Sequence, residues 1–159
     1  MSDALFNDFQ LYLETAQVES INEELKLLGV GCDICRVGRL EYLYEKWGEK
    51  IGVRILSPQE MSIWITKKKS IHFLAKRWAG NKAVVKALGL GFRKGLRWRE
   101  ISILNDKNGK PFVQFTGQTK QLLVSDKQQV KCYISLADEE MQALAYCVAF
   151  ISITPQPSG

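Results

Sequence analysis

Two lysines, Lys82 and Lys86, stand four residues apart in a segment whose apolar residues recur at helical spacing. At that spacing both ammonium groups lie on one face of a helix, one turn beyond Trp78. Like charges placed this way repel by roughly 0.2–0.5 kcal/mol unless an anion lies between them. The pair therefore indicates either a site for a phosphate-like anion or a solvated lysine face.

A carboxylate with unusual neighbours lies earlier in the chain. Asp33 ends the run GVGCD, in which Gly29 and Gly31 alternate with apolar residues. Carboxylates are rarely placed among apolar side chains unless they have partners. Asp33 either accepts hydrogen bonds from backbone donors at a turn or belongs to a functional site, and both interpretations stay open on the residues alone.

The cysteines provide half of a zinc or redox spacing, Cys32-x-x-Cys35, but no second pair of this kind follows. His72 is the only histidine, and residues three apart on an extended segment face opposite sides. We therefore expect buried, free thiols at all four cysteines, 32, 35, 132 and 147.

The periodicity of the chain predicts the elements that must position these side chains. Helices are expected over residues 3–25, 36–47, 70–88 and 119–124. A further helix is expected to start at Ser57, in a capping box with Glu60, and to end before 67–69. Strands are expected over 27–37, 97–104, 112–115, 129–136 and 142–153, with an Asn-Gly hairpin at 105–110. Helices segregated from a mostly antiparallel sheet define an α+β fold. We divide the chain into an acidic helical extension (1–26), one domain (27–153) and a flexible tail (154–159).

The charge of the chain is unevenly distributed. The formal net charge is +5, but six of the 17 acidic residues precede residue 26 and all 22 Lys and Arg follow the first 25 residues. Such a basic body attracts phosphates, nucleic acid or an acidic protein. No aromatic and basic platform for nucleic acid stands out, and no apolar run reaches the roughly 18 residues of a membrane span. We therefore expect a cytoplasmic protein that binds neither membrane nor nucleic acid.

Four motifs, taken in order, give the chain a family resemblance. They are GVGCDI (29–34), the helix around Trp78, Ala79, Ala83, Lys86 and Ala87, NDKNGKP (105–111) and ISLADE (134–139). Together they resemble the holo-acyl-carrier-protein synthase family of phosphopantetheinyl transferases. The resemblance implies a small antiparallel sheet packed around a long central helix, here with an extra N-terminal helix. It also implies a cytoplasmic homotrimer that acts in fatty acid biosynthesis and lipid metabolism.

The implied activity is transfer of the 4'-phosphopantetheine group from coenzyme A to a serine of an acyl carrier protein, with Mg²⁺. The resemblance implies catalytic roles for Asp33, Lys86 and Lys82, with Asp33 also the metal ligand. It implies coenzyme A binding by Arg77, Lys86, Asn105, Gly109, Lys110, Pro111, Tyr133 and Ser135, and carrier binding by Arg39 and Arg54. Tyr133 stands where many members of the family have histidine.

The main departure from the family pattern is Lys82, which stands where members carry the second metal-binding glutamate. A cation in place of a metal ligand puts the Mg²⁺ in question. Two interpretations stay open. Either the protein binds coenzyme A or a carrier without efficient transfer, or the Lys82 ammonium takes over part of the role of the metal.

Overall fold

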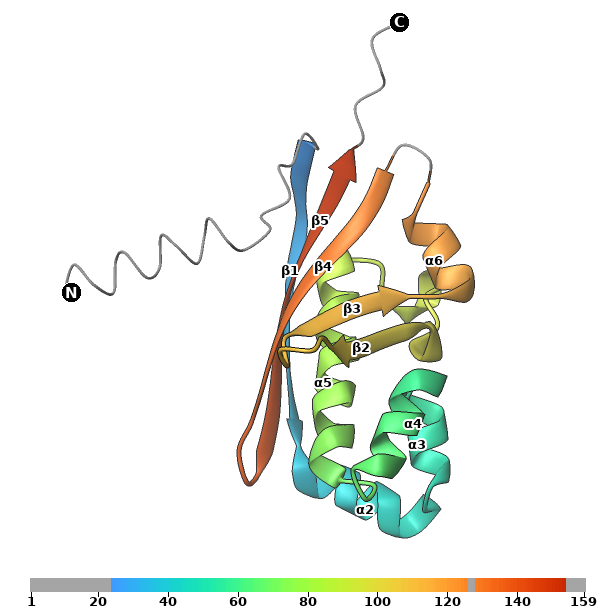
Figure 1. The fold of residues 1–159 in the computed structure, drawn as a ribbon, viewed down its shortest axis with the longest axis vertical. Helices are drawn as coiled ribbons and strands as arrows, with labels where there is room; N and C mark the ends of the chain where they lie inside the picture. The colour runs from blue at the N-terminus through green and yellow to red at the C-terminus, as the bar shows by residue number, and fades with distance from the viewer. Residues whose placement is uncertain (1–23, 126–127, 154–159) are drawn as a thin grey trace, which may run out of the picture.

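The structure is a computed structural model and describes residues 24–125 and 128–153 (Figure 1). Its strands are β1 (Glu24–Arg36), β2 (Ile101–Asn105), β3 (Pro111–Phe115), β4 (Gln128–Asp138) and β5 (Gln142–Ile153). Its α-helices are α2 (Val37–Trp47), α3 (Lys50–Ile55), α4 (Pro58–Thr66), α5 (Ile71–Leu88) and α6 (Gly117–Leu123), and two 3-10 turns cover Phe92–Lys94 and Trp98–Glu100. The α+β class is confirmed.

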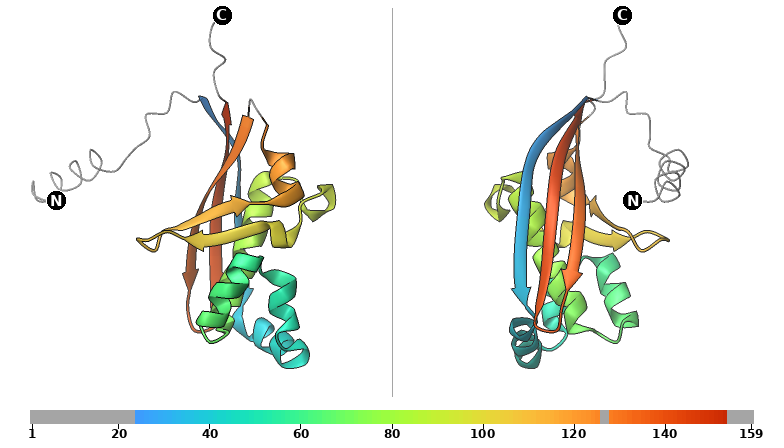
Figure 2. Two further views of the ribbon diagram at one scale, coloured as in Figure 1. Left: turned by 45° about the vertical axis from the view of Figure 1, so that its right-hand side comes forward. Right: turned by 90° about the vertical axis from the view of Figure 1, so that its left-hand side faces the viewer.

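Three long strands form an antiparallel sheet in the order β1-β5-β4, and helix α5 lies along one face of it. The other face carries no helix in the described part of the chain (Figure 2). Strands β2 and β3 form a separate antiparallel hairpin, and α2, α3 and α4 pack at one end of α5 (Figure 1). The expected antiparallel strands around a long central helix are therefore present, but they form two separate sheets.

Helix α5 can approach β1 closely because small residues line the contact. A Cβ atom on Gly31 would lie 1.9 Å from the carbonyl oxygen of Ala83, and one on Gly29 would lie 2.4 Å from that of Ala87. Only glycine avoids both overlaps. The inner face of β5 adds alanines at 143, 145 and 149, all fully buried. The glycines of the GVGCD run thus bring Asp33, two residues further along the strand, against the helix.

The ends of α4 and α5 follow the expected local chemistry. Ser57 and Glu60 form both hydrogen bonds of the capping box at the start of α4. Ser70 caps α5, which ends at Gly89 in the left-handed conformation with φ +67°. The Asn-Gly turn closes the β2–β3 hairpin, with Gly109 at φ +84°. These predictions are confirmed because each depends on residues that are close in sequence.

The secondary structure departs from the expectation in two places, and a third expected element lies almost wholly outside the described residues. The strand predicted over 97–104 begins only at Ile101, since Trp98 turns into a 3-10 segment and stacks on Phe92 at a ring distance of 4.6 Å. Helix α3 was not predicted. The helix predicted over 3–25 lies outside the described residues except for its last two positions, which begin β1.

The four cysteines are free, as expected, and Cys35 and Cys147 are buried, but Cys32 is exposed and Cys132 is only partly buried, so the prediction of a buried thiol is wrong at those two positions. Cys32 lies on the outer face of β1, whereas Cys35 points into the core. Among the described residues, no helix is long and apolar enough to cross a membrane.

Candidate active site

Asp33, Lys82 and Lys86, here called the Asp33 cluster, meet where β1 crosses α5. The Oδ1 atom of Asp33 lies 2.8 Å from the Nζ of Lys86 and 3.2 Å from the Nζ of Lys82. Lys86 also donates to the carbonyl oxygen of Cys32, at 2.7 Å. The carboxylate side chain is 5% exposed, but those of Lys82 and Lys86 are 36% and 53% exposed. The cluster therefore consists of a buried carboxylate that holds two ammonium groups at the protein surface.

The other carboxylate oxygen of the cluster, Asp33 Oδ2, is buried and accepts no hydrogen bond from the described residues.

Burial raises the pKa of the neighbouring Cys35 thiol, although the positive charges of Arg39 and Lys82 act against that rise. The thiol therefore stays protonated at neutral pH, and the charge of the cluster comes from the carboxylate and its two lysines.

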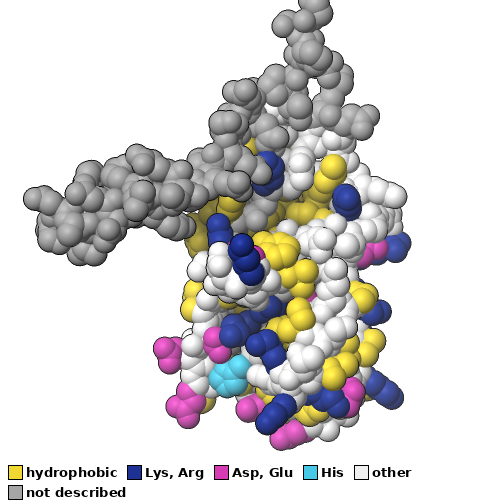
Figure 3. All heavy atoms as spheres, in the orientation of Figure 1, with side chains coloured by type: hydrophobic (Ala, Val, Ile, Leu, Met, Phe, Trp, Pro, Cys, Tyr) yellow, Lys and Arg dark blue, Asp and Glu magenta, His cyan; other side chains and the backbone are white. Residues whose placement is uncertain are grey.

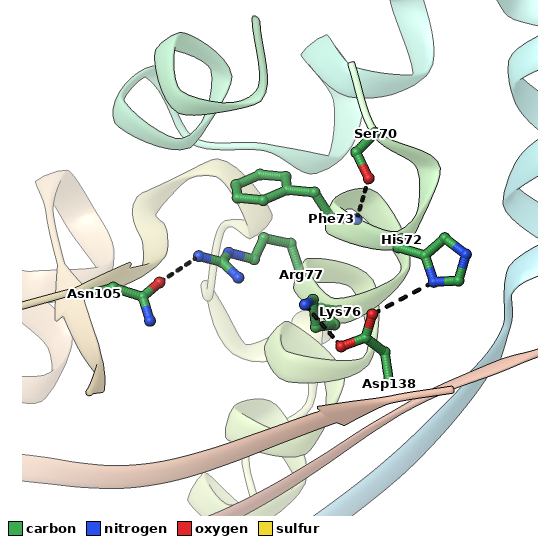
Figure 4. A network of polar contacts seen from close by, with 7 residues as sticks. All are labelled: Ser70, His72, Phe73, Lys76, Arg77, Asn105 and Asp138. Carbon is green, nitrogen blue, oxygen red and sulfur yellow. Dashed lines mark hydrogen bonds and ion pairs between the residues drawn. The ribbon is translucent and has the colours of Figure 1, made fainter. Parts of the chain in front are cut away.

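A second group of predicted residues lines a hollow of about 630 Å³ on the other side of α5, here called the Arg77 hollow. It is lined by Arg77, Asn105, Gly109 and Pro111, which were predicted to bind coenzyme A, and by Lys67, His72, Lys76 and Asp138 among others. The guanidinium of Arg77 donates to Asn105 Oδ1 at 3.1 Å (Figure 4). Asn105 Nδ2 in turn donates to the carbonyl oxygen of Gly109 at 2.7 Å. Arg77 and Asn105 thus join the helix to the hairpin turn. Lys110 lies in the same turn and is exposed.

A triad of polar side chains at the edge of this hollow, Lys76, His72 and Asp138, was not predicted to form part of the site. Lys76 Nζ lies 2.8 Å from Asp138 Oδ1, and His72 Nδ1 lies 3.4 Å from Asp138 Oδ2 (Figure 4). The hydrogen bond from Lys76, with a contribution from His72, holds the pKa of Asp138 below its usual value. On the face drawn in Figure 3, Lys and Arg side chains gather beside the single histidine. The ISLADE motif was a sequence signal for Asp138, whereas its partners follow only from the fold.

A buried charge pair lies behind the Arg77 hollow. The Glu60 side chain is fully buried; its Oε2 accepts from the backbone of Ser57 at 2.9 Å and its Oε1 from that of Ile103 at 2.8 Å. Arg77 Nε lies 3.6 Å from Oε1, and the guanidinium stacks over the Phe73 ring at 4.2 Å. Burial raises the pKa of Glu60 and lowers that of Arg77, while each charge opposes the shift of the other. The sequence identified Glu60 only as a helix cap.

Tyr133 and Ser135 lie away from both sites within one chain. Both are exposed on β4, on the face of the sheet opposite α5, and the Tyr133 ring meets Phe150 edge-on at 5.8 Å. This outer face also exposes large apolar side chains, namely Leu27, Val30, Ile34, Leu144 and Tyr146. In one chain, then, the structure does not bring Tyr133 and Ser135 together with the other residues predicted to bind coenzyme A.

The two arginines predicted to bind a carrier protein do share a site. Arg39 and Arg54 line a groove of about 470 Å³ between α2, α3 and α5, together with Lys50 and with Leu43, Trp47, Ile51, Ile55, Trp78 and Trp98. The Arg39 guanidinium lies 5.2 Å from the centre of the Trp78 ring. We call this the tryptophan groove. It combines an apolar floor with three cationic side chains.

The residues around Asp33 do not fit the Mg²⁺ that the family resemblance implies. Mg²⁺ prefers carboxylate oxygens, and within residues 24–125 and 128–153 no three His, Cys, Asp or Glu side chains are grouped so that they could hold a metal ion. Both lysine ammonium groups lie beside Asp33, where the ion would bind. Two unit charges of the same sign ~4 Å apart repel by about 4 kcal/mol in an effective dielectric of ~20. A divalent ion at Asp33 would meet two such ammonium groups, which oppose its binding.

Comparison with known proteins defines the class to which this fold and site belong. Residues 29–147 match the model of the 4'-phosphopantetheinyl transferase superfamily. The matched region contains the whole Asp33 cluster, the tryptophan groove and the residues of the Arg77 hollow. The chain therefore belongs to the 4'-phosphopantetheinyl transferase superfamily.

Within that class the chain is similar to holo-[acyl-carrier-protein] synthases. It is 37% identical to that of Enterobacter sp. (strain 638) over 121 residues, which are 76% of this chain and 95% of the relative. The crystal structure of the synthase from Neisseria meningitidis covers 78% of this chain and 98% of its own, with 33% identity and a TM-score of 0.71. The Plasmodium yoelii synthase with ADP bound covers 80% and 97%, with 29% identity and a TM-score of 0.68.

Proposed function

We propose that this protein transfers the 4'-phosphopantetheine group of coenzyme A to a serine of an acyl carrier protein. The observation that carries the proposal is the meeting of Asp33 with Lys86 on α5, in a chain that belongs to this superfamily and resembles holo-[acyl-carrier-protein] synthases over nearly their whole length. That resemblance favours transfer over the alternative function, binding of coenzyme A or a carrier without transfer.

The reaction asks the protein mainly to position and neutralise a diphosphate. The serine oxygen forms a new bond to the phosphorus that carries the pantetheine arm, and the bond from that phosphorus to the bridging oxygen breaks. Adenosine 3',5'-bisphosphate leaves with the electron pair, and the serine proton passes to water held near Asp33. Fixed cations stabilise the charge that develops on the diphosphate, so Lys86 and Lys82 are placed to accelerate the transfer.

The Arg77 hollow is the proposed site for the nucleotide part of coenzyme A. Its volume suits a nucleotide, and Arg77, Lys76 and Lys67 line it with positive charge. A synthase from Bacillus anthracis, 27% identical over 78% of this chain, with a TM-score of 0.60, has been solved in complex with CoA (3',5'-ADP). Because the Arg77 hollow and the Asp33 cluster lie on different sides of α5, one coenzyme A molecule would contact both only where two chains meet, with its nucleotide in the hollow of one chain and its diphosphate at the cluster of the next.

The tryptophan groove is the proposed docking site for the carrier protein. Arg39, Lys50 and Arg54 surround an apolar floor, which fits an acidic, amphipathic helix of the partner. Trp78 lines this groove one helical turn before Lys82 on α5, so a carrier held in the groove would bring its serine close to the Asp33 cluster.

The outer face of the sheet is the proposed interface of a homotrimer. Ile34 is 55% exposed, Val30 49% and Tyr146 45%, so a contiguous apolar surface remains uncovered in one chain. Burying it against a second copy would also bring Tyr133 and Ser135 to an interface, where they can contact coenzyme A bound to the neighbouring chain. Light scattering should then return the mass of three chains, and an Ile34→Lys variant should return a smaller species.

The transfer itself is tested with apo-carrier protein, coenzyme A and the full-length chain. Mass spectrometry should show the carrier gaining one phosphopantetheine group on its serine. A carrier that keeps its mass with every added cofactor, while coenzyme A still binds, would instead support binding without transfer. A cytoplasmic location is part of the same proposal, since both substrates are expected there.

A further inference from the structure

Within the part of the chain that the structure describes, the Asp33 cluster carries an excess of positive charge. Two ammonium groups share the single oxygen Oδ1 of one carboxylate, which leaves a formal charge of +1 on the cluster. Both lysine side chains are at least one-third exposed, whereas the carboxylate is buried. An ion pair that served only the fold would need one cation for the one carboxylate. The second cation is available to an anion from solvent.

The carboxylate also gives the two lysines a fixed position. A long lysine side chain loses rotational freedom about several bonds when it binds a phosphate, and this loss of conformational entropy weakens binding by a flexible lysine. Here Asp33 holds both Nζ atoms within 3.2 Å of one point before any ligand arrives. Each ammonium has three N–H donors, so donors remain for an oxyanion after the contact with Asp33 is made. The arrangement is preorganised for an anion with several oxygens.

We infer that the Asp33 cluster binds the diphosphate of coenzyme A through Lys82 and Lys86 directly, without a divalent metal ion. The inference rests on the proposed function for the identity of the ligand. It follows from the misfit between these residues and Mg²⁺: where a metal would need a second carboxylate, this chain already supplies a charge that pairs with the diphosphate. Lys82 thus neutralises the ligand in place of a metal and does not mark a lost site.

The first test is calorimetric titration of coenzyme A into the full-length protein, once with a chelator and once with millimolar MgCl₂. We expect the two dissociation constants to agree within about twofold, because the protein itself supplies the neutralising charge. Lys82→Gln should weaken binding at least tenfold in both buffers. The matched control is Lys46→Gln, which removes an exposed lysine that lies over the Trp47 ring at the end of α2, and it should leave the affinity unchanged.

The second test reverses the charge at the same position. Lys82→Glu places a second carboxylate beside Asp33, so coenzyme A affinity should fall at least a hundredfold in chelator and recover on addition of MgCl₂. Titration of MgCl₂ alone should produce heat with this variant and none with the wild-type protein. Circular dichroism of each variant shows whether the fold is kept, and Lys82→Met provides a second, uncharged substitution if Lys82→Gln does not fold.

The outcomes separate this inference from the proposed function. Binding that requires MgCl₂ in the wild-type protein, or an affinity that Lys82→Gln leaves unchanged, overturns the inference even if the carrier is modified. Binding in chelator without modification of the carrier supports the inference and overturns the transfer. Absence of binding in both buffers at millimolar coenzyme A overturns both.

Discussion

Helix α5 presents basic side chains to several carboxylates, and two of these contacts, Arg77 with Glu60 and Lys86 with Asp33, differ in how far the basic group is exposed to solvent. Arg77 is 5% exposed and Glu60 is fully buried, so that pair is sealed inside the protein. Lys86 is 53% exposed while its partner Asp33 is 5% exposed. One cation is therefore committed to the core, and the other is held at the surface by a buried anion.

The hydrogen bonds of the two carboxylates differ in the same way. Both oxygens of Glu60 accept from backbone donors, those of Ser57 and Ile103, so that carboxylate links α4 to β2. Asp33 accepts only at Oδ1 among the described residues, and only from side chains on α5. A buried charge whose hydrogen-bonding groups all have partners stabilises a fold. A buried charge that has hydrogen bonds at only one oxygen, and whose partners are exposed, is typical of a ligand site. The following predictions test this contrast, from the largest expected effect to the smallest.

Removing the sealed carboxylate should affect stability most. Glu60→Ala leaves Arg77 buried without a charge partner and two backbone donors unsatisfied, so we expect a loss of about 3–5 kcal/mol of unfolding free energy. Urea unfolding followed by circular dichroism measures it. The control is Glu49→Ala, which removes an exposed carboxylate paired with Lys69 and should cost less than about 1 kcal/mol. Equal losses in the two variants would contradict the contrast.

Removing an exposed cation of the Asp33 cluster should affect activity instead. Lys86→Ala should lower kcat/KM for carrier modification about 100-fold, which corresponds to about 2.7 kcal/mol of transition-state stabilisation. The unfolding free energy should change by less than about 1 kcal/mol, because the lysine is more than half exposed. Lys120→Ala, at an exposed lysine on α6, serves as the control for both measurements. A large loss of stability with unchanged kcat/KM would make Lys86 a structural residue.

The close approach that brings Asp33 to α5 can be tested through Gly31. In Gly31→Ala the new Cβ would lie 1.9 Å from the backbone of Ala83, so strand and helix must separate, at a cost of about 1–3 kcal/mol. Transfer should fall as well, since Asp33 moves with the strand. Gly38→Ala is the matched control: its Cβ meets only Glu41, at 3.7 Å, and alanine in helix α2 should stabilise by about 0.5–1 kcal/mol. Effects of the same sign at both glycines would contradict the close-approach argument.

The smallest effect is expected at Asp138, a carboxylate whose partners are also partly exposed. Lys76→Ala removes the main cause of its depressed pKa, so that pKa should rise toward the usual value in a carboxyl NMR titration. A depressed pKa contributes stability above the unfolded-state pKa of about 3.9, and this contribution is lost as the pH falls through the folded-state value. The change in stability should stay below about 1 kcal/mol. An unchanged pKa of Asp138 would show that His72, and not Lys76, controls it.

Features that depend on neighbours in the chain could be predicted from the sequence. The capping box of Ser57 and Glu60, the end of α5 at Gly89 and the shared face of Lys82 and Lys86 all follow from residues within one or two turns. The GVGCD and NDKNGKP motifs, with the pattern of the central helix, were enough to indicate the family. Local hydrogen bonding and helical periodicity are properties of the sequence itself, so this level of structure needs no knowledge of the fold.

Contacts between distant segments required the tertiary structure. Asp33 and Lys86 are 53 residues apart, and whether that lysine was solvated or paired depended on where β1 crosses α5. Glu60 could be recognised as a cap, but its burial against Ile103 and Arg77 could not, because periodicity does not say which faces meet. The position of Tyr133 on the outer face, away from Arg77, was equally hidden from the sequence. Strand order and helix packing determine these distances, and they arise from the burial of the whole apolar core.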